Sequence, residues 1–339
     1  MRGIYTPEGW LNMPEIRKLK TPFIFVVGGR GIGKTYGAIK DTIDNDIRFM
    51  FMRRTQKQAD LISVQELSPF KAPCFDMGLS YCTKTIATNC SGLYLIDGEG
   101  EHLAGYVTAL STISGLRGFD ASDVDLWIYD EFIPERHERQ IKFEGEAFLN
   151  AYETINRNRE LNGRPPLKCL CLSNSNDVGN PIFTTMGIAD IALKMQERGR
   201  NVYINDKRGI SIILPHNSPI SEQKKDTALY RAAGEGRFSS MAIGNTFEQE
   251  TGIAARDLNE FTLMTSCGKL YFYKHKSTEE IYCTGHRRGT AEHYDNDYTS
   301  ILQFRSANRW LQSAFLLGRL TFENVKCKRD FENIFFNRS

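Results

Sequence analysis

The segment from Phe23 to Thr35 constrains the fold of this chain more than any other part of the sequence. Five apolar residues, FIFVV, are followed by GGRGIGKT, which matches the pattern G-x-x-x-x-G-K-[ST]. The apolar run predicts a buried strand, the glycines predict a tight loop, and we expect a helix to begin at Lys34. Loop N–H groups and a helix N-terminus attract anions, so this order of elements predicts a phosphate-binding loop. The alternative is a glycine-rich turn that binds nothing.

Each residue type in this loop suits the binding of ATP with Mg²⁺. Glycines let backbone N–H groups turn toward the phosphates, Lys34 would neutralise phosphate charge, and the Thr35 hydroxyl would bind the Mg²⁺ ion. The residues expected to bind the nucleotide are Gly28, Gly29, Arg30, Gly31, Ile32, Gly33, Lys34, Thr35 and the adjacent Tyr36.

A second apolar run, LWIY at 126–129, ends in the acidic pair Asp130 and Glu131. In P-loop ATPases an aspartate at this position holds Mg²⁺, and an adjacent glutamate polarises the attacking water. We therefore expect Asp130 to be a metal ligand and Glu131 to be catalytic. The alternative is a turn that caps a helix. The glutamate favours ATP chemistry, and the sequence contains no N-K-x-D motif of the kind that reads guanine.

Short apolar runs separated by helix-length segments predict an α/β domain with a mainly parallel sheet. The runs lie at 48–53, 126–129 and 167–172, and a β-hairpin is expected around Asp97–Gly100. Apolar residues at helical spacing predict a helix over 144–159. Together with the acidic pair, this organisation predicts a P-loop NTPase of the additional-strand catalytic-glutamate (ASCE) type.

The length of 339 residues, with 41% of them hydrophobic, suggests two domains. We expect an ATPase domain at 1–220, followed by a polar linker or small helical lid at 221–251. Residues 252–339 are expected to form a small α+β domain, with a strand at 269–273 and a helix at 305–317.

Net charge, hydropathy and cysteine spacing indicate which partners and which cellular compartment to expect for the protein. The 43 basic and 41 acidic residues nearly cancel, so any DNA-binding surface must be local. No run of 18 apolar residues occurs and the N-terminal residues lack the apolar segment of a signal peptide, so we expect a cytoplasmic protein without a membrane partner. The eight cysteines show no C-x-x-C spacing, which favours reduced thiols over disulfides; a zinc site assembled from scattered Cys and His is the alternative.

Five motifs in this order resemble those of the DNA-packaging ATPases of small tailed bacteriophages, the compact relatives of large terminase subunits. The matching motifs are GGRGIGKT at 28–35, FMRR at 51–54, YDEF at 129–132, RNRE at 157–160 and CLSN at 171–174. The resemblance spans most of the first 220 residues. Its phosphate loop and acidic pair are general to P-loop ATPases, whereas RNRE followed by CLSN is more specific to the family.

The resemblance implies roles for further polar residues. Arg157 would be an arginine finger that enters the ATP site of a neighbouring subunit, with Arg159 as the local alternative. Ser173 and Asn174 would sense the γ-phosphate and couple hydrolysis to movement. Arg53 and Arg54 would orient the catalytic glutamate or line the nucleotide pocket.

The resemblance also suggests where DNA would bind. The segment 114–125 is similar to a loop that faces the central pore of terminase-type motors, so Arg117 would contact DNA phosphates, with Lys57 as a second candidate. Plain surface residues are the alternative for both. The C-terminal domain resembles a reduced RNase H-like nuclease. Basic segments at 286–288 and 326–329 would contact nucleic acid or the capsid portal.

The combined interpretation is a ring-forming subunit that uses ATP and Mg²⁺ to drive double-stranded DNA into a preformed capsid in the infected cell. The family resemblance implies a homo-oligomeric ring of five subunits, a capsid portal as partner and an accessory RNA as a further candidate partner. Two alternatives are a terminase large subunit with an active metal-dependent nuclease and a DNA-binding protein that switches with nucleotide but barely hydrolyses it.

Overall fold

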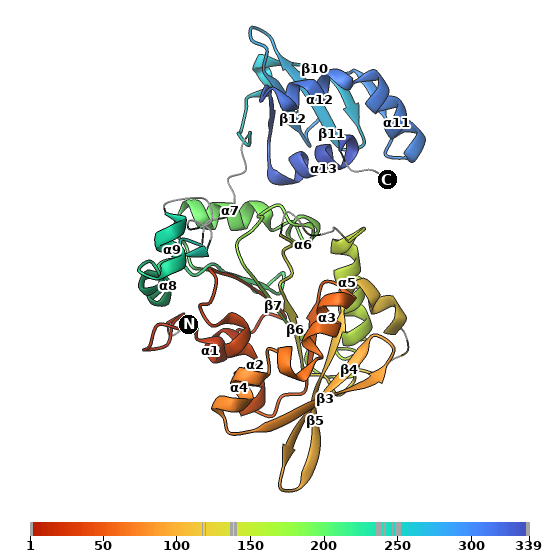
Figure 1. Ribbon diagram of the computed structural model, residues 1–339. Helices are drawn as coiled ribbons and strands as arrows, with labels where there is room; N and C mark the ends of the chain where they lie inside the picture. The colour runs from red at the N-terminus through yellow and green to blue at the C-terminus, as the bar shows by residue number, and fades with distance from the viewer. Residues whose placement is uncertain are drawn as a thin grey trace. The chain divides into compact units, whose positions relative to one another are not determined.

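The computed structural model describes residues 3–336 except 117, 119, 136, 137, 139, 140, 235–238, 240, 241, 246 and 248–251 (Figure 1). The chain divides into two compact units. Unit 1 comprises Met1–Thr185 and Ile191–Glu248, and unit 2 comprises Met186–Asp190 and Gln249–Ser339. Most of the expected linker or lid at 221–251 therefore belongs to unit 1, to which it contributes helical turns described below.

Unit 1 is built on a nine-stranded sheet with the order β3-β4-β5-β2-β6-β7-β1-β9-β8. Its strands are β1 (Phe23–Val27), β2 (Phe49–Arg53), β3 (Ser80–Ala87), β4 (Cys90–Asp97), β5 (Gly100–Ala109), β6 (Leu126–Asp130), β7 (Lys168–Ser173), β8 (Val202–Asn205) and β9 (Ile210–Ile213). Strands β5, β2, β6, β7, β1 and β9 run parallel, and the remaining edge strands pair antiparallel.

Strand β7 lies between β1, which leads into the phosphate loop, and β6, which ends in the acidic pair. This inserted strand is the additional strand of the ASCE type. The expected fold class, a mainly parallel P-loop sheet with a separate small α+β domain, is confirmed.

The helices of unit 1 connect these strands (Figure 1). They are α1 (Met13–Arg17), α2 (Lys34–Asp44), α3 (Gln56–Ile62), α4 (Lys71–Asp76), α5 (Glu144–Asn156), α6 (Pro181–Thr185), α7 (Ala189–Glu197), α8 (Pro219–Lys224) and α9 (Ala228–Ala233), with 3₁₀ turns η1 (Gln65–Leu67) and η2 (Leu110–Leu116). The predicted helix over 144–159 therefore ends three residues earlier than expected.

Alternate residues of each strand point to opposite faces of the central sheet, and helices cover both faces. Ile24 and Val26 of β1 belong to a core that also contains residues of α1, α2, α3 and α4. On the other face, the ring of Phe25 lies 5.4 Å from that of Phe183 in α6, and the ring of Trp127 lies 5.1 Å from that of Phe148 in α5. Each fully buried aromatic ring contributes about 1.5–3 kcal/mol, so the strands that lead to the site are held from both sides.

The hairpin predicted around Asp97–Gly100 is present. Strands β4 and β5 pair antiparallel, with Asp97 opposite Gly100 and a two-residue turn between them. Gly100 has a φ of 129°, which a glycine adopts without steric cost. The long β3–β4–β5 hairpins project from one edge of the sheet (Figure 1).

Unit 2 is a five-stranded sheet of order β13-β10-β11-β12-β14 with three helices. Its elements are the 3₁₀ turn η3 (Leu258–Glu260), β10 (Phe261–Cys267), β11 (Leu270–His275), β12 (Ile281–Thr284), β13 (Glu292–Tyr294), α11 (Tyr298–Ala307), α12 (Arg309–Leu316), β14 (Leu320–Phe322) and α13 (Val325–Phe335). The helix predicted at 305–317 is present but interrupted, because α11 ends at Ala307 and α12 begins at Arg309, with Asn308 between them. The Asn308 side chain donates to the carbonyl of Phe304 at 3.1 Å, and such local bonds compete with helix continuation.

The acidic residues of unit 2 lie in turns and pairs. Asp257 and Asp297 accept backbone N–H groups at the starts of η3 and α11, and Asp330 pairs with Lys326. Among the residues that the structure describes, no group of three His, Cys, Asp or Glu side chains could hold a metal ion.

Two further properties concern the whole chain. All eight cysteines are free thiols, and seven of them are buried. No helix within the described ranges is long and apolar enough to cross a membrane.

Candidate nucleotide-binding site

The loop from Gly28 to Gly33 joins β1 to α2 at the carboxyl edge of the parallel strands. Gly31 and Gly33 have φ values of 63° and 91°, so both occupy the left-handed region that favours glycine. Gly33 is the N-cap of α2, and its conformation directs the first N–H groups of the helix into the loop. The predicted order of strand, loop and helix is therefore present. The loop lies at the amino end of α2, where the binding of an anion is favoured.

Lys34 folds back over this loop. Its Nζ atom donates to the carbonyl oxygens of Gly28 at 2.9 Å and Gly29 at 2.7 Å, and to Oδ1 of Asn174 at 3.0 Å. Burial lowers the pKa of Lys34 to about 7, although the carboxylates of Asp130 and Glu131 oppose this shift. Among the described residues no carboxylate forms an ion pair with this buried ammonium, so Lys34 is suited to bind an anion.

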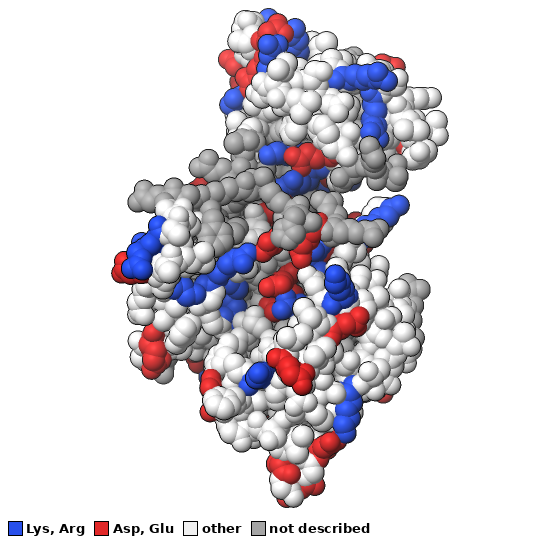
Figure 2. Space-filling view, in the orientation of Figure 1, with Lys and Arg blue, Asp and Glu red and all other residues white. Residues whose placement is uncertain are grey.

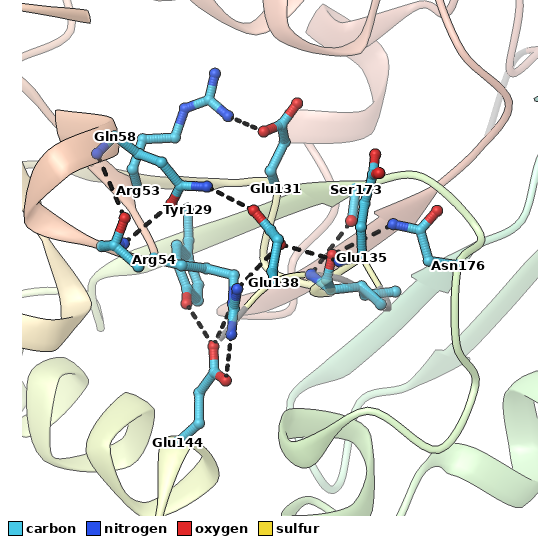
Figure 3. A network of polar contacts seen from close by, with 12 residues as sticks. Arg53, Arg54, Gln58, Tyr129, Glu131, Glu135, Glu138, Glu144, Ser173 and Asn176 are labelled. Carbon is cyan, nitrogen blue, oxygen red and sulfur yellow. Dashed lines mark hydrogen bonds and ion pairs between the residues drawn. The ribbon is translucent and has the colours of Figure 1, made fainter. Parts of the chain in front are cut away.

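The acidic pair meets the loop at the end of β6. The Thr35 hydroxyl donates to Oδ1 of Asp130 at 3.0 Å, and burial raises the pKa of Asp130. Arg53, the last residue of β2, lies 3.4 Å from Oδ2 of Asp130 and forms an ion pair with Glu131 (Figure 3). The structure thus brings Thr35, Asp130, Glu131 and Arg53 to one sheet edge beside the loop.

Glu131 has an unusual backbone. Its φ of 56° puts a residue that carries a side chain in the left-handed region, which costs about 1–3 kcal/mol. Its carboxylate is roughly half exposed, in contrast to the buried Asp130. The chain turns sharply here, so the two adjacent carboxylates occupy different environments.

Ser173 ends β7 and Asn174 follows it, between the loop and the acidic strand. The Ser173 carbonyl accepts the N–H of Gly28 at 3.1 Å, and its hydroxyl accepts the N–H of Ile133 at 3.2 Å. Asn174 contacts Lys34 directly. Both polar side chains expected to sense the nucleotide therefore touch segments that carry other site residues.

Arg54 takes a separate position from Arg53. Its fully buried guanidinium forms two hydrogen bonds to Glu144, the first residue of α5, at 2.7 and 2.9 Å, and lies 3.1 Å from Glu138 (Figure 3). The Gln58 side chain donates to the same Glu138 at 2.8 Å. Sequence reasoning missed Glu138 and Glu144, since no local pattern links them to an arginine some 90 residues away.

Arg157 and Arg159 lie beyond the end of α5. Arg159 is buried, donates to the carbonyl of Val124 and forms an ion pair with Asp125 at 2.6 Å. Arg157 is the C-cap of α5, its side chain is 43% exposed, and it lies 4.0 Å from Asp120. Asp125 precedes β6 and Asp130 ends it, so the Arg159 anchor lies roughly 16 Å along the strand from the acidic pair.

The remaining predicted residues occupy varied positions. Tyr36 donates from its hydroxyl to Asp76 of α4 at 2.6 Å, so this group is engaged with a helix and not with the loop. Lys57 is exposed on α3. Arg117 lies outside the described residues. Figure 2 shows basic and acidic side chains interspersed on the visible face, and no large patch of one sign.

The segment after β9 also contributes to the site, which the sequence did not indicate. Lys224 at the end of α8 donates to the carbonyls of Arg30 at 2.8 Å and Gly31 at 2.9 Å. The polar composition of 221–251 suggested a linker or lid, and nothing in it marked one lysine as a partner of the loop.

Comparisons with known proteins agree with this architecture. The family model described as "Podovirus DNA encapsidation protein (Gp16)" matches residues 8–259. The chain belongs to this family. The resemblance inferred from the five motifs is thereby confirmed.

Curated relatives of the family include two phage proteins described as "DNA packaging protein". The protein of Bacillus phage B103 is 29% identical over 243 residues, which is 68% of this chain and 65% of that protein. The protein of Bacillus phage phi29 is 26% identical over 345 residues, which is 94% of this chain and 93% of that protein. The chain thus spans just under two thirds of the first relative and nearly all of the second.

Two solved structures share the fold over almost the whole chain. A chain of the phi29 viral genome packaging motor assembly gives a TM-score of 0.67 at 21% identity, covering 96% of this chain and 98% of that chain. A chain of the phi28 gp11 DNA packaging motor gives 0.64 at 18% identity, covering 98% and 100%. The two-unit architecture is therefore common to all three proteins.

Proposed function

We propose that this chain is the ATPase subunit of a ring-shaped motor that drives double-stranded viral DNA into a preformed capsid. The observation that carries the proposal is the meeting of Lys34, Thr35, Asp130 and Glu131 at one sheet edge, in a chain that belongs to the DNA encapsidation family. The packaging activity is named for its relatives, and the site chemistry supports the same activity here.

The residues present fit a magnesium ion beside the nucleotide. Thr35 and Asp130 offer adjacent hydroxyl and carboxylate oxygens, the ligand type that Mg²⁺ prefers, and the Asp130 carboxylate is buried where a bound cation would offset its charge. When bound, Mg²⁺ held by Thr35 and Asp130 would neutralise the negative charge that develops on the phosphates. Gly28–Thr35 would hold the phosphates of ATP.

Glu131 is the residue proposed to orient the attacking water. Arg53 pairs with this carboxylate and fixes its direction at the end of β6. Asn174 occupies one N–H donor of Lys34, and the three acceptors of that ammonium account for all its donors. A phosphate that takes a donor from Lys34 would release Asn174, and Ser173 would carry the change to the segment after Glu131.

Arg157 is proposed to act on the site of a neighbouring subunit. It lies two residues from Arg159, whose partner Asp125 is roughly 16 Å along β6 from the acidic pair, so we infer that Arg157 acts on another subunit's site and not on its own loop. Arg159 is committed to Val124 and Asp125, whereas Arg157 is partly exposed. These contacts favour Arg157 over Arg159 as the arginine that enters another subunit.

Mixing two inactive variants tests the ring mechanism. Lys34→Ala removes the phosphate-binding ammonium and Arg157→Ala removes the proposed finger, so neither pure ring should hydrolyse ATP. Mixed rings contain interfaces that join an intact loop to an intact arginine, and we expect DNA-stimulated hydrolysis to return. Arg159→Ala mixed with Lys34→Ala is the control for the alternative. No recovered activity in rings shown by co-purification of differently tagged subunits to be mixed would contradict the trans role of Arg157.

Contacts with DNA and with other motor components are part of the same proposal. Lys57, exposed at the start of α3, and Arg117 are proposed to contact DNA phosphates without reading sequence. The capsid portal and an accessory RNA are proposed partners of a ring of five subunits in the host cytoplasm. Lys57→Ala should lower the salt dependence of DNA binding by about one phosphate contact.

A further inference from the structure

Lys224, at the end of α8, and Ala242 both contact the crest of the phosphate loop. Lys224 donates to the carbonyls of Arg30 and Gly31, at 2.8 and 2.9 Å. The N–H of Arg30 donates in turn to the carbonyl of Ala242 at 2.9 Å. Both backbone polar groups of Arg30 are therefore bound by residues that lie far later in the sequence.

Packing around these bonds is tight. A Cβ atom on Gly29 would lie 2.5 Å from the Ala242 carbonyl oxygen, and one on Gly31 would lie 2.1 Å from Nζ of Lys224. The Ala242 carbonyl leaves no room for a side chain at Gly29, and a side chain at Gly31 would push the Lys224 ammonium away from the loop. The two glycines are thus fitted to Ala242 and Lys224, in addition to any demand that phosphates place on the loop.

Two more buried side chains lie near the loop and β1. Ser221, one helical turn before Lys224, is only 2% exposed, and its Oγ has no hydrogen-bond partner within the described part of the chain. This hydroxyl would lie 3.5 Å from a Cβ atom on Gly29. The side chain of Asn245 donates to the carbonyls of Val27 at 2.9 Å and Pro215 at 3.1 Å, so Asn245 is tied to the end of β1.

The charge on Lys224 is not neutralised locally. Within the described ranges it forms no ion pair with an acidic side chain, and its ammonium has three N–H donors of which the two loop carbonyls use two. Burial lowers the pKa of Lys224, and its positive charge also contributes to the lowered pKa of Lys34. Two ammonium groups thus converge on one loop, which is a field that attracts a polyphosphate.

We propose that Lys224 is a positioning residue of the nucleotide site, which holds the crest of the loop in its phosphate-binding conformation and adds positive charge to it. This inference rests on the proposed nucleotide-binding function of the loop. The ligand class is a nucleoside diphosphate or triphosphate. Because the loop is needed equally before and during hydrolysis, loss of Lys224 should weaken binding of both nucleotides and leave the chemical step nearly unchanged.

The test measures nucleotide binding and turnover in the full chain. Dissociation constants for ADP and for a non-hydrolysable ATP analogue are compared in wild type, Lys224→Ala, Lys224→Arg and Lys225→Ala, together with KM and kcat for ATP. Lys225 is the matched control, because it is the next residue, is exposed and pairs with Glu222.

We expect Lys224→Ala to raise both dissociation constants and KM by roughly tenfold, with kcat within about twofold of wild type. Lys224→Arg should retain much of the affinity because it keeps a cation, and Lys225→Ala should behave as wild type. Unchanged affinity in Lys224→Ala would overturn the inference, and so would a fall in kcat at unchanged KM. The inference would also be overturned if Lys224→Ala and Lys224→Arg both lost nucleotide affinity and showed an equal fall in melting temperature. A general packing defect would then explain the loss of affinity.

Lys34→Ala separates this inference from the proposed function. If wild type binds nucleotide and Lys34→Ala does not, the loop function stands, and the Lys224 variants alone decide the inference. If wild type and Lys34→Ala fail equally to bind nucleotide, the proposed function itself is contradicted.

Discussion

Arg53 and Arg54 are adjacent in sequence but act on different carboxylates. Successive side chains of a strand point to opposite faces, so the end of β2 directs one arginine to the acidic pair and the other into the core beneath α5. The two arginines of the motif FMRR therefore have separate roles. Arg53 belongs to the proposed chemistry of the site, whereas Arg54 anchors the helix that leads to Arg157.

We predict that Arg53→Ala lowers kcat for ATP about hundredfold, while the dissociation constant for ADP changes by less than about threefold. The reason is that Arg53 orients Glu131 and touches no residue of the phosphate loop in the described contacts. Steady-state hydrolysis and nucleotide titration provide the two measurements. Arg53→Lys should be intermediate because it keeps the charge without the planar fork.

Lys40→Ala is the control for that prediction. It removes one basic residue that pairs with Asp44 on the exposed side of α2. Hydrolysis should be unchanged in this variant. An Arg53→Ala protein with wild-type kcat would show that Glu131 needs no orienting partner.

Local patterns predicted the parts of the site whose residues adjoin in sequence. The phosphate loop and the acidic pair each lie where an apolar run ends, and the expected strands and hairpin formed there. The T-x-x-Q pattern at Thr55 and Gln58 likewise corresponds to the capping box that begins α3. Long-range pairs were not predictable, because a lone glutamate such as Glu144 and a lone lysine such as Lys224 carry no signal of their distant partners.

At the scale of elements, the amino end of α5 depends on a buried ion pair. Arg54 and Glu144 are both fully buried, and removing Arg54 leaves the Glu144 carboxylate buried without the arginine that neutralises its charge. We predict that Arg54→Ala destabilises unit 1 by about 3–5 kcal/mol, and that Arg54→Met combined with Glu144→Leu recovers most of this loss. Urea unfolding followed by Trp127 fluorescence, with Trp10 and Trp310 replaced by Phe, measures both variants.

An equal loss in the single and the double variants would contradict this account. It would mean that the remaining contacts of Arg54 with Glu138, or of Glu144 with Tyr129, carry the stability and not the pair itself.

Because α1 packs closely against α2, we expect a glycine-to-alanine substitution in α2 to destabilise the protein, although such a substitution usually stabilises a helix. Replacing a mid-helix glycine by alanine usually stabilises a helix by about 0.5–1 kcal/mol. At Gly37 a Cβ atom would lie 2.7 Å from Cγ of Met13, so we predict that Gly37→Ala destabilises unit 1 by about 1–3 kcal/mol. The same unfolding measurement applies. Met13→Ala should make room for the added methyl group, so that α2 returns to its original position. The double variant Gly37→Ala with Met13→Ala should then bind ADP as wild type does.

For the whole molecule, the residues proposed to bind and hydrolyse ATP all lie in unit 1. The five-stranded sheet of unit 2 can be tested separately for nuclease activity. All contacts of the phosphate loop described above lie in unit 1. Asp257 and Asp297 of unit 2 accept backbone N–H groups and Asp330 pairs with Lys326, and no three metal-binding side chains converge within the described ranges. A two-metal nuclease needs several carboxylates around ions about 3.5–4 Å apart.

We therefore predict that the full chain does not cleave DNA with Mg²⁺ or Mn²⁺, under conditions in which it hydrolyses ATP. Supercoiled plasmid incubated with the protein and either ion, and resolved on a gel, gives the measurement, with ATP turnover in the same sample as the control for folded protein. Asp297→Ala and Asp330→Ala should alter the stability of unit 2 and leave the plasmid intact. Cleavage that requires Mn²⁺ and disappears in either variant would instead favour an active terminase-type nuclease, because carboxylates would then have to converge on metal in a conformation different from this one.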